Sequence, residues 1–594
     1  MKIDVLLSTM NRKSINDNLQ LLQKMNINGS SITINQCPKF KKDELVFSKN
    51  MNIKNKILSY SEKGLSKSRN RAIKCSNADI CVIADDDLVY VNNYEQIILN
   101  AYKKYPDADI IAFHVESLNT DRKTSVQKEG RKKFLGSMKI ASFQITFKRR
   151  SIIDNEILFD EDFGAGSGRF TAGEENIFLF DCLKKKLKIY YIPTQIAVVN
   201  HMDSTWFVGY NDVFFETLGA AFYRMSPTFS ELFILQYAVR KYYKYGKTLS
   251  FLKAYKYMKK GKKRKSFVPF FIGDFKTFNG PAIANKNIKK GVGKRALYSN
   301  SSSNLMRLIE LLIKSLFSDC LFFCSFSKLD VIGIKIAKFL KKKTFYLMHG
   351  RIELENNINK KLNVNLSQME KYILDNVSYI VCVSKLLSDE ISKEGYNHKT
   401  EYVFNGIDYS DIVVSEKLNK DSNLIMSTGG LMPIKNNIVV CEAIDLLNKK
   451  YNCNLKYLIV GDDFGNLKQL NKYDFVNYIN HTSHEKCLRY MKKSNIYVQN
   501  SIHETFGLAV IESIVNDCNL LISKNVGSKD IITTLNDEDI IYDPNDINEI
   551  SKKILRLLTV PNSKRIKGGL VPEETDIVAR GHQLLNMIGD KLYE

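Results

Sequence analysis

The sequence predicts an α/β protein built from parallel or mixed sheets covered by helices. Short strand-like runs, such as IDVLLST near the N-terminus and LKYLIVG near residue 460, alternate with stretches that have a helical pattern of apolar residues. This alternation is typical of strands joined by crossover helices. A chain of 594 residues is too long for one hydrophobic core, so we expect several structural units.

Four segments follow from this pattern in chain order. Residues 1–217 contain the runs IDVLLST, ADICVIAD, ADIIAFHV and KIYYIP, which predict a first α/β domain. Residues 218–266 are helical, aromatic and basic without a strand signal, and we interpret them as a helical connector. The alternation then resumes twice, which predicts two doubly wound domains over residues 267–415 and 416–594.

Composition excludes several classes of protein. The apolar fraction of 44% indicates folded globular material rather than a disordered chain. The eleven cysteines include no Cys-x-x-Cys pair, so neither a zinc site nor a disulfide framework is indicated, and a reducing compartment fits best. The N-terminus reads as a strand rather than a signal peptide, and residues 308–326 carry Glu310, Lys314 and Asp319. We therefore expect a cytoplasmic protein without a transmembrane helix.

A basic run lies between Arg240 and Lys265. It holds twelve lysines and arginines and no acid, interleaved with aromatic and aliphatic residues. Such a run can bind an anionic membrane surface or nucleic acid, and a solvated linker is the alternative. Although the net charge of +24 resembles that of nucleic-acid-binding proteins, no recognition motif accompanies it, so we expect no nucleic-acid partner.

Three consecutive aspartates, Asp85 to Asp87, follow the apolar run ICVIA. In open α/β sheets, ligands bind at the carboxyl ends of strands. Alternate carboxylates at such a position can hold a hard divalent cation, which usually keeps waters and also binds substrate phosphates. A helix N-cap or a polar turn is the alternative.

The surrounding motifs occur in a familiar order. EKGLSKSRNRAI precedes the aspartates, and AGEEN and VVNHMDS follow them. This set resembles the family 2 glycosyltransferases, which have the GT-A fold, over about the first 210 residues. The resemblance implies that Thr9 and Asn11 receive the nucleotide base and that Ser68 and Arg69 lie near the nucleotide. It also implies that Asp85 and Asp87 hold Mn²⁺ or Mg²⁺ and, through it, the donor diphosphate.

The same resemblance identifies a general base. The family usually has Glu-Asp where this chain has Glu174 and Glu175, and the second residue removes a proton from the acceptor hydroxyl. Glu175 is the expected base, but its side chain is one methylene longer than aspartate, so the choice between Glu174 and Glu175 stays open. His201 would lie near the metal, with a purely structural histidine as the alternative.

A second candidate site lies in the stretch SIHETFGLAVIES. Its Glu504 and Glu512 are eight residues apart, which would leave them about 80° apart on one helix. They can converge on one ligand if Glu504 lies in a loop and a helix begins near Gly507. Such a helix would offer free amides and a positive dipole end to a diphosphate. A surface helix with two unrelated acids is the alternative.

Further motifs accompany this pair. In order they are TFNGPAIANKNI, LMHGR, VCVSK, VFNGID, STGGLMPIKNN, LIVGDD and SKNVGSKDII. The series resembles the family 4 glycosyltransferases over about 300 residues. That family has the GT-B fold, in which two Rossmann-like domains face each other across a cleft, and its members retain anomeric configuration without a metal.

The resemblance implies a role for each matching residue. Glu512 would bind the ribose, Glu504 the hydroxyls of the donor sugar and Lys435 the diphosphate. His349 would lie close to the reacting centre. The backbone amides around Phe506, Gly507 and Leu508 would bind the phosphate and the sugar. Gly280, in the first motif of the series, would line the donor site. Gly430 stands where the family usually has an arginine, so Lys435 would carry the phosphate charge alone unless another basic residue compensates.

These expectations combine into a bifunctional glycosyltransferase. An inverting, metal-dependent N-terminal head would be joined to a retaining, metal-independent C-terminal head, with UDP-sugars as the expected donors. Such a pairing fits the synthesis of a bacterial surface polysaccharide, capsule or glycoconjugate on a glycan or polyprenyl-linked acceptor. Residues 240–265 would hold the enzyme at the inner face of the membrane. The alternative is one active head, with the other module binding the acceptor or serving the structure.

Overall fold

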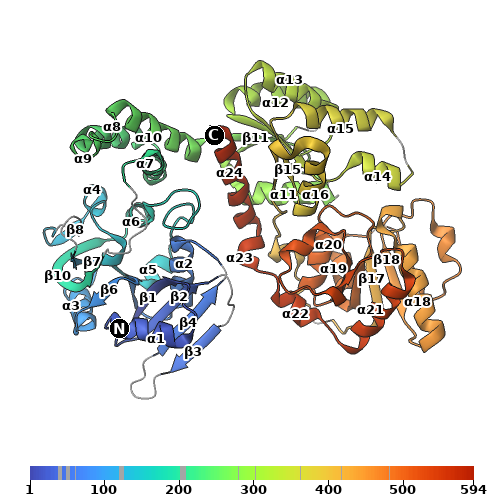
Figure 1. The fold of residues 1–594 in the computed structure, drawn as a ribbon, viewed down its shortest axis with the longest axis horizontal. Helices are drawn as coiled ribbons and strands as arrows, with labels where there is room; N and C mark the ends of the chain where they lie inside the picture. The colour runs from blue at the N-terminus through green and yellow to red at the C-terminus, as the bar shows by residue number, and fades with distance from the viewer. Residues whose placement is uncertain are drawn as a thin grey trace. The chain divides into compact units, whose positions relative to one another are not determined.

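The computed structural model describes residues 1–37, 43–47, 54–60, 62–118, 126–200, 209–277, 280–301, 303–360, 363–416, 418–480 and 482–594. Within them the chain forms two compact units, residues 1–266 and 267–592 (Figure 1). Each unit is built from sheets with helices between the strands. The predicted α/β class is therefore confirmed.

The described residues of the first unit form one mixed sheet. Its strand order is β3-β4-β2-β1-β5-β9-β7-β10-β6, with β8 paired to β10. Strands β4, β2, β1 and β5 are parallel to one another, whereas β9 is antiparallel to both of its neighbours. The strands are β1 (Ile3–Met10), β2 (Ser31–Gln36), β3 (Asp43–Phe47), β4 (Lys54–Tyr60), β5 (Ile80–Asp85), β6 (Leu88–Tyr90), β7 (Ile110–Ser117), β8 (Gly130–Lys132), β9 (Ile145–Lys148) and β10 (Ile189–Val199).

Burial on both faces explains the continuous apolar runs of the central strands. Residues 80–84 of β5 are fully buried, and alternate members belong to two different core clusters. Such strands lose the polar alternation of a half-exposed sheet. The helices of this unit are α1 (Ile15–Lys24), α2 (Leu65–Cys75), α3 (Tyr94–Lys104), α4 (Phe134–Ser137), α5 (Arg149–Ile153), α6 (Glu174–Lys184), α7 (Asp212–Met225), α8 (Ser230–Arg240), α9 (Tyr242–Tyr245) and α10 (Phe251–Ser266).

Residues 218–266, interpreted from sequence as a connector, lie inside the first unit. Helices α7 and α10 cross in direct backbone contact, because a Cβ added at Gly219 would come within 1.8 Å of the Met258 carbonyl oxygen, and one at Gly261 within 1.8 Å of the Glu216 carbonyl oxygen. Ala254 and Met258 of α10 are buried in a cluster with Phe215 of α7. The helices therefore form part of a folded core.

Most cations in the second half of the basic run pair with acids from elsewhere in the unit. Lys259 and Lys262 pair with Glu231 of α8. Lys260 and Arg264 pair with Glu216 of α7, and Lys265 pairs with Asp162. The basic run has no acids of its own, and tertiary packing supplies them. The paired lysines and arginines of its second half therefore stabilise the first unit.

The second unit contains two parallel sheets in its described residues. The first has the order β12-β11-β13-β14-β15-β16 and the second the order β19-β18-β17-β20-β21-β22. Their strands are β11 (Pro269–Ile272), β12 (Leu297–Tyr298), β13 (Cys320–Phe323), β14 (Thr344–Met348), β15 (Tyr379–Cys382), β16 (Thr400–Tyr402), β17 (Asp421–Thr428), β18 (Lys456–Val460), β19 (Val476–Ile479), β20 (Ser494–Gln499), β21 (Asn519–Ser523) and β22 (Ile540–Ile541).

The last helix of the second unit returns to the first of these two sheets. An added Cβ at Gly291 of α11 would come within 1.9 Å of the Ile577 carbonyl oxygen at the start of α24. The helices are α11 (Gly280–Val292), α12 (Asn304–Phe317), α13 (Lys328–Phe339), α14 (Ile352–Ile358), α15 (Val364–Asn376), α16 (Lys385–Ile391), α17 (Tyr409–Ile412), α18 (Asn437–Tyr451), α19 (His484–Lys493), α20 (Leu508–Val515), α21 (Ile547–Thr559), α22 (Ser563–Gly568), α23 (Pro572–Thr575) and α24 (Ile577–Tyr593).

The structure bears on the expectations about membrane-spanning helices and about cysteines. In the described part of the chain, no helix combines the length and the apolar character that crossing a membrane requires. All eleven cysteines lie in described segments and carry free thiols.

The crossing of α7 and α10 yields a stability prediction. Gly219→Ala forces two helix backbones apart, because the new methyl group would overlap the Met258 carbonyl, and it should lower the unfolding free energy of the first unit by about 1–3 kcal/mol. Thermal unfolding of the full chain measures this loss. Gly136→Ala in α4, where the nearest atom to the added Cβ is 3.4 Å away on a flexible lysine, is the matched control. Equal melting temperatures for both variants would contradict this packing.

Candidate active sites

The first candidate site lies at the carboxyl ends of β1 and β5. These strands are neighbours in parallel register, with Ser8 opposite Asp85. The Thr9 hydroxyl donates a hydrogen bond to Asp86 at 2.7 Å, and Arg12 donates to the same carboxylate at 3.2 Å. Because parallel strands end at the same edge, residues 77 positions apart in sequence meet here.

A buried arginine organises the carboxylates of this site. Arg69 of α2 has no exposed side-chain surface. Its guanidinium donates to Asp85 at 2.9 Å, to Glu174 at 3.0 Å and to the Ser142 hydroxyl at 3.0 Å. The structure thus places Arg69 beneath the site, as a bridge between two acids, and any effect on the nucleotide would pass through Asp85.

Two further residues expected at the nucleotide are also positioned by their neighbours. The Ser68 hydroxyl donates to the Ser8 hydroxyl at 2.8 Å, and both side chains are buried. Asn11 has a left-handed backbone with φ of 57°, and its amide donates to the Gln36 carbonyl oxygen at 3.0 Å. Of these two, only Asn11 lies in the exposed part of the loop after β1.

The acidic pair Glu174 and Glu175 begins helix α6. Glu174 is buried and pairs with Arg69, whereas Glu175 accepts a hydrogen bond from Asn176 at 2.9 Å. The pKa of Glu175 is raised to about 8, first by burial and second by the negative charge of Glu174. One acid is therefore held by a guanidinium, and the other is poised to exchange a proton near neutral pH. The structure thus distinguishes the two acids, and the choice of base between them stays open.

The predicted metal ligands fit a cation only in part. Asp85 and Asp87 supply carboxylate oxygens from the end of β5 and the turn after it, and His201 lies outside the described residues. Within the described segments, no group of three or more His, Cys, Asp or Glu side chains is arranged to hold a metal. With two described carboxylates, a hard cation would have to complete its shell with phosphate oxygens and water, so Mn²⁺ or Mg²⁺ at this position stays a prediction.

The second candidate site centres on the loop between β20 and α20. Glu504 in this loop pairs with Lys435, which ends a short 3₁₀ turn, Pro433–Lys435. Gln499 also donates to Glu504, at 3.3 Å. The side chain expected to hold the diphosphate and the one expected to hold the sugar thus contact each other directly.

Backbone packing explains the missing arginine at position 430. Gly430 has a positive φ of 61°, and an added Cβ would come within 2.0 Å of the Asp462 carbonyl oxygen. An arginine cannot occupy this position without moving the neighbouring loop. The departure from the family pattern is therefore built into the fold of residues 429–462.

The helix predicted near Gly507 is present. Helix α20 begins at Leu508 directly after Gly507, and Phe506 is buried. Glu512 lies within α20 and pairs with His484 at 2.9 Å between Oε1 and Nε2. This hydrogen bond raises the pKa of His484 above its ordinary value. Sequence reasoning missed His484, because the partner comes from helix α19 and no local spacing links the two residues.

His349 is held in one tautomer. The Asn285 amide nitrogen donates to two carbonyl oxygens, those of Asp274 and Cys324, so its oxygen must accept from His349 Nε2 at 2.9 Å. Burial lowers the pKa of His349 to about 4. The ring is therefore neutral at pH 7 with an unprotonated Nδ1. Sequence reasoning missed Asn285, although it lies in the quoted stretch TFNGPAIANKNI.

Hydrogen bonds link the two halves of the second unit near this loop. The Thr505 hydroxyl donates to the His349 carbonyl oxygen, and His503 pairs with Glu390 of α16 at 2.9 Å. The second unit therefore brings His349 close to the loop that carries Glu504. Gly280 opens α11, and an added Cβ would meet no atom within 4 Å.

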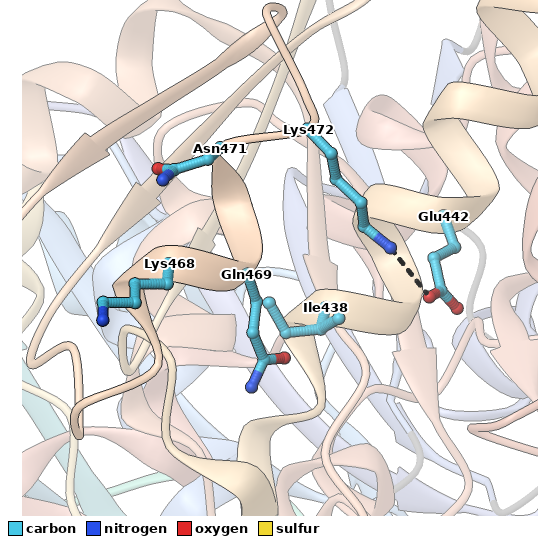
Figure 2. Close-up of a pocket in the computed structure, with 6 residues that line it drawn as sticks. All are labelled: Ile438, Glu442, Lys468, Gln469, Asn471 and Lys472. Carbon is cyan, nitrogen blue, oxygen red and sulfur yellow. Dashed lines mark ion pairs between the residues drawn. The ribbon is translucent and has the colours of Figure 1, made fainter.

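An open surface depression of about 530 Å³ lies elsewhere on the second unit. Figure 2 shows its lining on α18 and the turn near residue 470, with an ion pair of 3.8 Å between Lys472 and Glu442. None of the predicted site residues lines it. It is therefore distinct from the candidate site of this unit.

Comparison with known proteins bears on the C-terminal part of the chain. Residues 408–567 match the family model described as glycosyl transferases group 1. The expectation of a GT-B-type glycosyltransferase domain in this part is therefore confirmed. No curated protein matches the sequence.

Solved structures also show likeness. The structure of Anabaena HepE in complex with UDP and glucose is similar with a TM-score of 0.44 and 13% identity, covering 55% of this chain and 100% of HepE. Sucrose-phosphate synthase from Thermosynechococcus elongatus is similar with a TM-score of 0.41 and 14% identity, covering 55% of this chain and 98% of its own.

The raised pKa of Glu175 predicts a pH-dependent stability. Since the folded-state pKa of about 8 exceeds the ordinary value of 4.5, the protonated form stabilises the fold, and this stability is lost as pH rises from about 4.5 through 8. Glu175→Gln should therefore raise Tm at pH 9 by at least ~3 °C more than at pH 5. Calorimetry of both proteins at the two pH values checks this. An equal change in Tm at pH 5 and pH 9 would show that the Glu175 carboxyl is not desolvated.

Proposed function

We propose that the chain is a bifunctional glycosyltransferase with one nucleotide-sugar centre in each unit. The observation that carries the proposal, and bears on the second unit, is the grouping of Lys435, Glu504 and the start of helix α20, which has no side-chain cap, inside the region that matches the glycosyltransferase family. A cation, a sugar-binding carboxylate and unbonded helix amides are the groups that a diphosphate sugar needs. UDP-sugars are the first donors to test.

In the second centre, each side chain has a defined task. Lys435 and the first amides of α20 bind the diphosphate, which draws Lys435 away from Glu504 and frees that carboxylate for sugar hydroxyls. Glu512, held by His484, binds the ribose. The unprotonated Nδ1 of His349 accepts a hydrogen bond from a substrate hydroxyl near the reacting carbon. This centre works with retention and without a metal.

In the first centre, Glu175 removes the proton of the acceptor hydroxyl, and inversion follows from direct attack on the sugar. Asp85 and Asp87 would hold Mn²⁺ or Mg²⁺ together with the donor diphosphate, and such a cation supplies Lewis acidity at the departing phosphate. Arg69 holds Asp85 and Glu174 in place beside Glu175. His201 is proposed as a further ligand.

The alternative of one active head is favoured by a specific observation. Gly430 leaves no room for the usual arginine, so the second centre binds the donor phosphates with Lys435 as its sole proposed side-chain cation. If that is insufficient, the second unit binds the acceptor and the first unit alone transfers sugar.

We also propose that the enzyme works on a glycan or polyprenyl-linked acceptor at the inner face of a bacterial membrane, in surface polysaccharide or capsule synthesis. The first half of the basic run supports this. Arg240, Lys244, Lys247, Lys253 and Lys256 are exposed. Beside them, apolar side chains of α8 and its neighbours are exposed: Leu232, Leu235, Val239, Tyr242, Tyr243 and Leu252. Such a mixture suits an anionic lipid surface.

Two variants of the full chain separate the two centres. With a nucleotide-sugar panel, Asp87→Asn should lower Mn²⁺-dependent turnover at least ~100-fold, because the cation loses a carboxylate. Glu504→Ala should lower metal-independent turnover at least ~10-fold, because a charged contact to the sugar is lost. Product release with and without Mn²⁺ measures both effects.

Asp107→Asn is the control for both variants and should retain full turnover. Asp107 precedes β7, at the opposite end of the sheet from the candidate site. If Asp87→Asn keeps its metal-dependent transfer, the assignment of Asp87 as a metal ligand is wrong. If Asp87→Asn abolishes all transfer and Glu504→Ala leaves transfer unchanged, only the first centre is active.

Charge reversal tests the lipid contact of the first unit. Lys244→Glu with Lys247→Glu and Lys253→Glu should weaken binding to phosphatidylglycerol vesicles at least ~10-fold, because each cation contributes about 1 kcal/mol near an anionic surface. Lys259→Gln with Lys262→Gln is the matched control, since these lysines pair with Glu231 and should affect stability instead. Vesicle co-sedimentation measures binding, and an equal loss for both sets would refute the assignment.

A further inference from the structure

Helix α12 of the second unit exposes an uninterrupted apolar face. Seven large apolar side chains on this helix are between 40% and 76% exposed: Leu305, Met306, Ile309, Leu312, Ile313, Leu316 and Phe317. At 100° per residue they fall within an arc of about 140°. A soluble surface helix normally turns its apolar residues toward the core, so an outward stripe of this size marks an interaction surface.

The polar side chains of α12 lie on its other side. Lys314 donates to the Tyr298 carbonyl oxygen and pairs with Glu310. Glu310 also accepts from the amides of Asn300 and Ser301, at 3.0 Å each. Because these groups are tied to the unit's own backbone, the exposed face carries no charge.

The neighbouring helix α13 adds cations to this surface. Helices α12 and α13 pack against each other in Figure 1. Lys328, Ile332, Lys335 and Phe339 are exposed at positions i, i+4, i+7 and i+11, which form one stripe along α13, and Phe339 is 87% exposed. Lysine stems can lie on an apolar surface while their charged ends reach outward.

The charge balance of this region is strongly positive. Residues 304–343 contain eight lysines and arginines but three acids. Of the acids, Asp330 is fully buried and Glu310 is largely covered, which leaves Asp319 exposed. A surface of apolar side chains flanked by cations is complementary to the headgroup and acyl boundary of an anionic bilayer.

We propose that the α12 face, with the α13 stripe beside it, is a lipid-binding surface that inserts its apolar side chains into an anionic membrane. A second copy of the chain fits less well, because two such faces would bring like charges together. The surface belongs to a different unit from the α8 region and does not depend on either catalytic proposal. It would hold the His349-bearing half of the second unit at the bilayer, where the lipid-linked acceptor of the proposed function would lie.

Vesicle binding of the full chain tests this surface. Leu312→Glu with Leu316→Glu should weaken binding to phosphatidylglycerol vesicles at least ~10-fold, because two side chains that would insert into the bilayer become charged. Both side chains are already exposed, so folding should be unaffected, and thermal unfolding checks this. Leu467→Glu with Val560→Glu, two comparably exposed side chains in the same unit, is the matched control and should bind as the wild type does.

Insertion can also be read directly. In Phe317→Trp, the added tryptophan fluorescence should shift to the blue with vesicles and be quenched by brominated lipids, relative to the wild-type background of one tryptophan. An unshifted, unquenched signal would overturn the proposal. So would a dimer in sedimentation velocity that Leu312→Glu with Leu316→Glu converts to monomer while vesicle binding is unchanged, since the face would then be a contact between copies.

Discussion

A guanidinium without access to water, Arg69, determines the arrangement of the first candidate site. An unpaired buried charge is too costly to persist, so Arg69 must be matched by acids, and it contacts both Asp85 at the end of β5 and Glu174 at the start of α6. This pairing fixes the distance between the strand that carries the aspartates and the helix that carries the proposed base. It also leaves Glu175 as the carboxyl with a raised pKa.

The second site uses the same kind of pairing at lower burial. Lys435 and Glu504 neutralise each other where the donor diphosphate and sugar are proposed to bind. Under the proposed function, a phosphate would compete for the lysine, and ligand binding would then be coupled to release of the carboxylate. Asn285 and His484 hold His349 and Glu512 in place from other helices. Both sites thus consist of reactive groups supported by partners that are distant in sequence.

Charge pairing also separates structural cations from those available to a partner. Lysines 259, 260 and 262 are matched by Glu231 and Glu216, whereas Lys244 and Lys253 are exposed. On α12, by contrast, seven large apolar side chains remain exposed. Two surfaces in two units therefore combine apolar and cationic groups.

The sequence by itself determined the α/β class, the strands and the loops at their carboxyl ends, because hydrophobic periodicity and turn residues are local properties. It also identified Asp85, Glu175, Lys435 and Glu504 as candidates. Tertiary structure alone decided that Arg69 lies buried beneath the site, that Gly430 excludes an arginine, and that most cations in the second half of the basic run pair with acids. These outcomes depend on which side chains and backbones meet across 30 to more than 100 residues of chain, and no local pattern in a single sequence encodes such contacts.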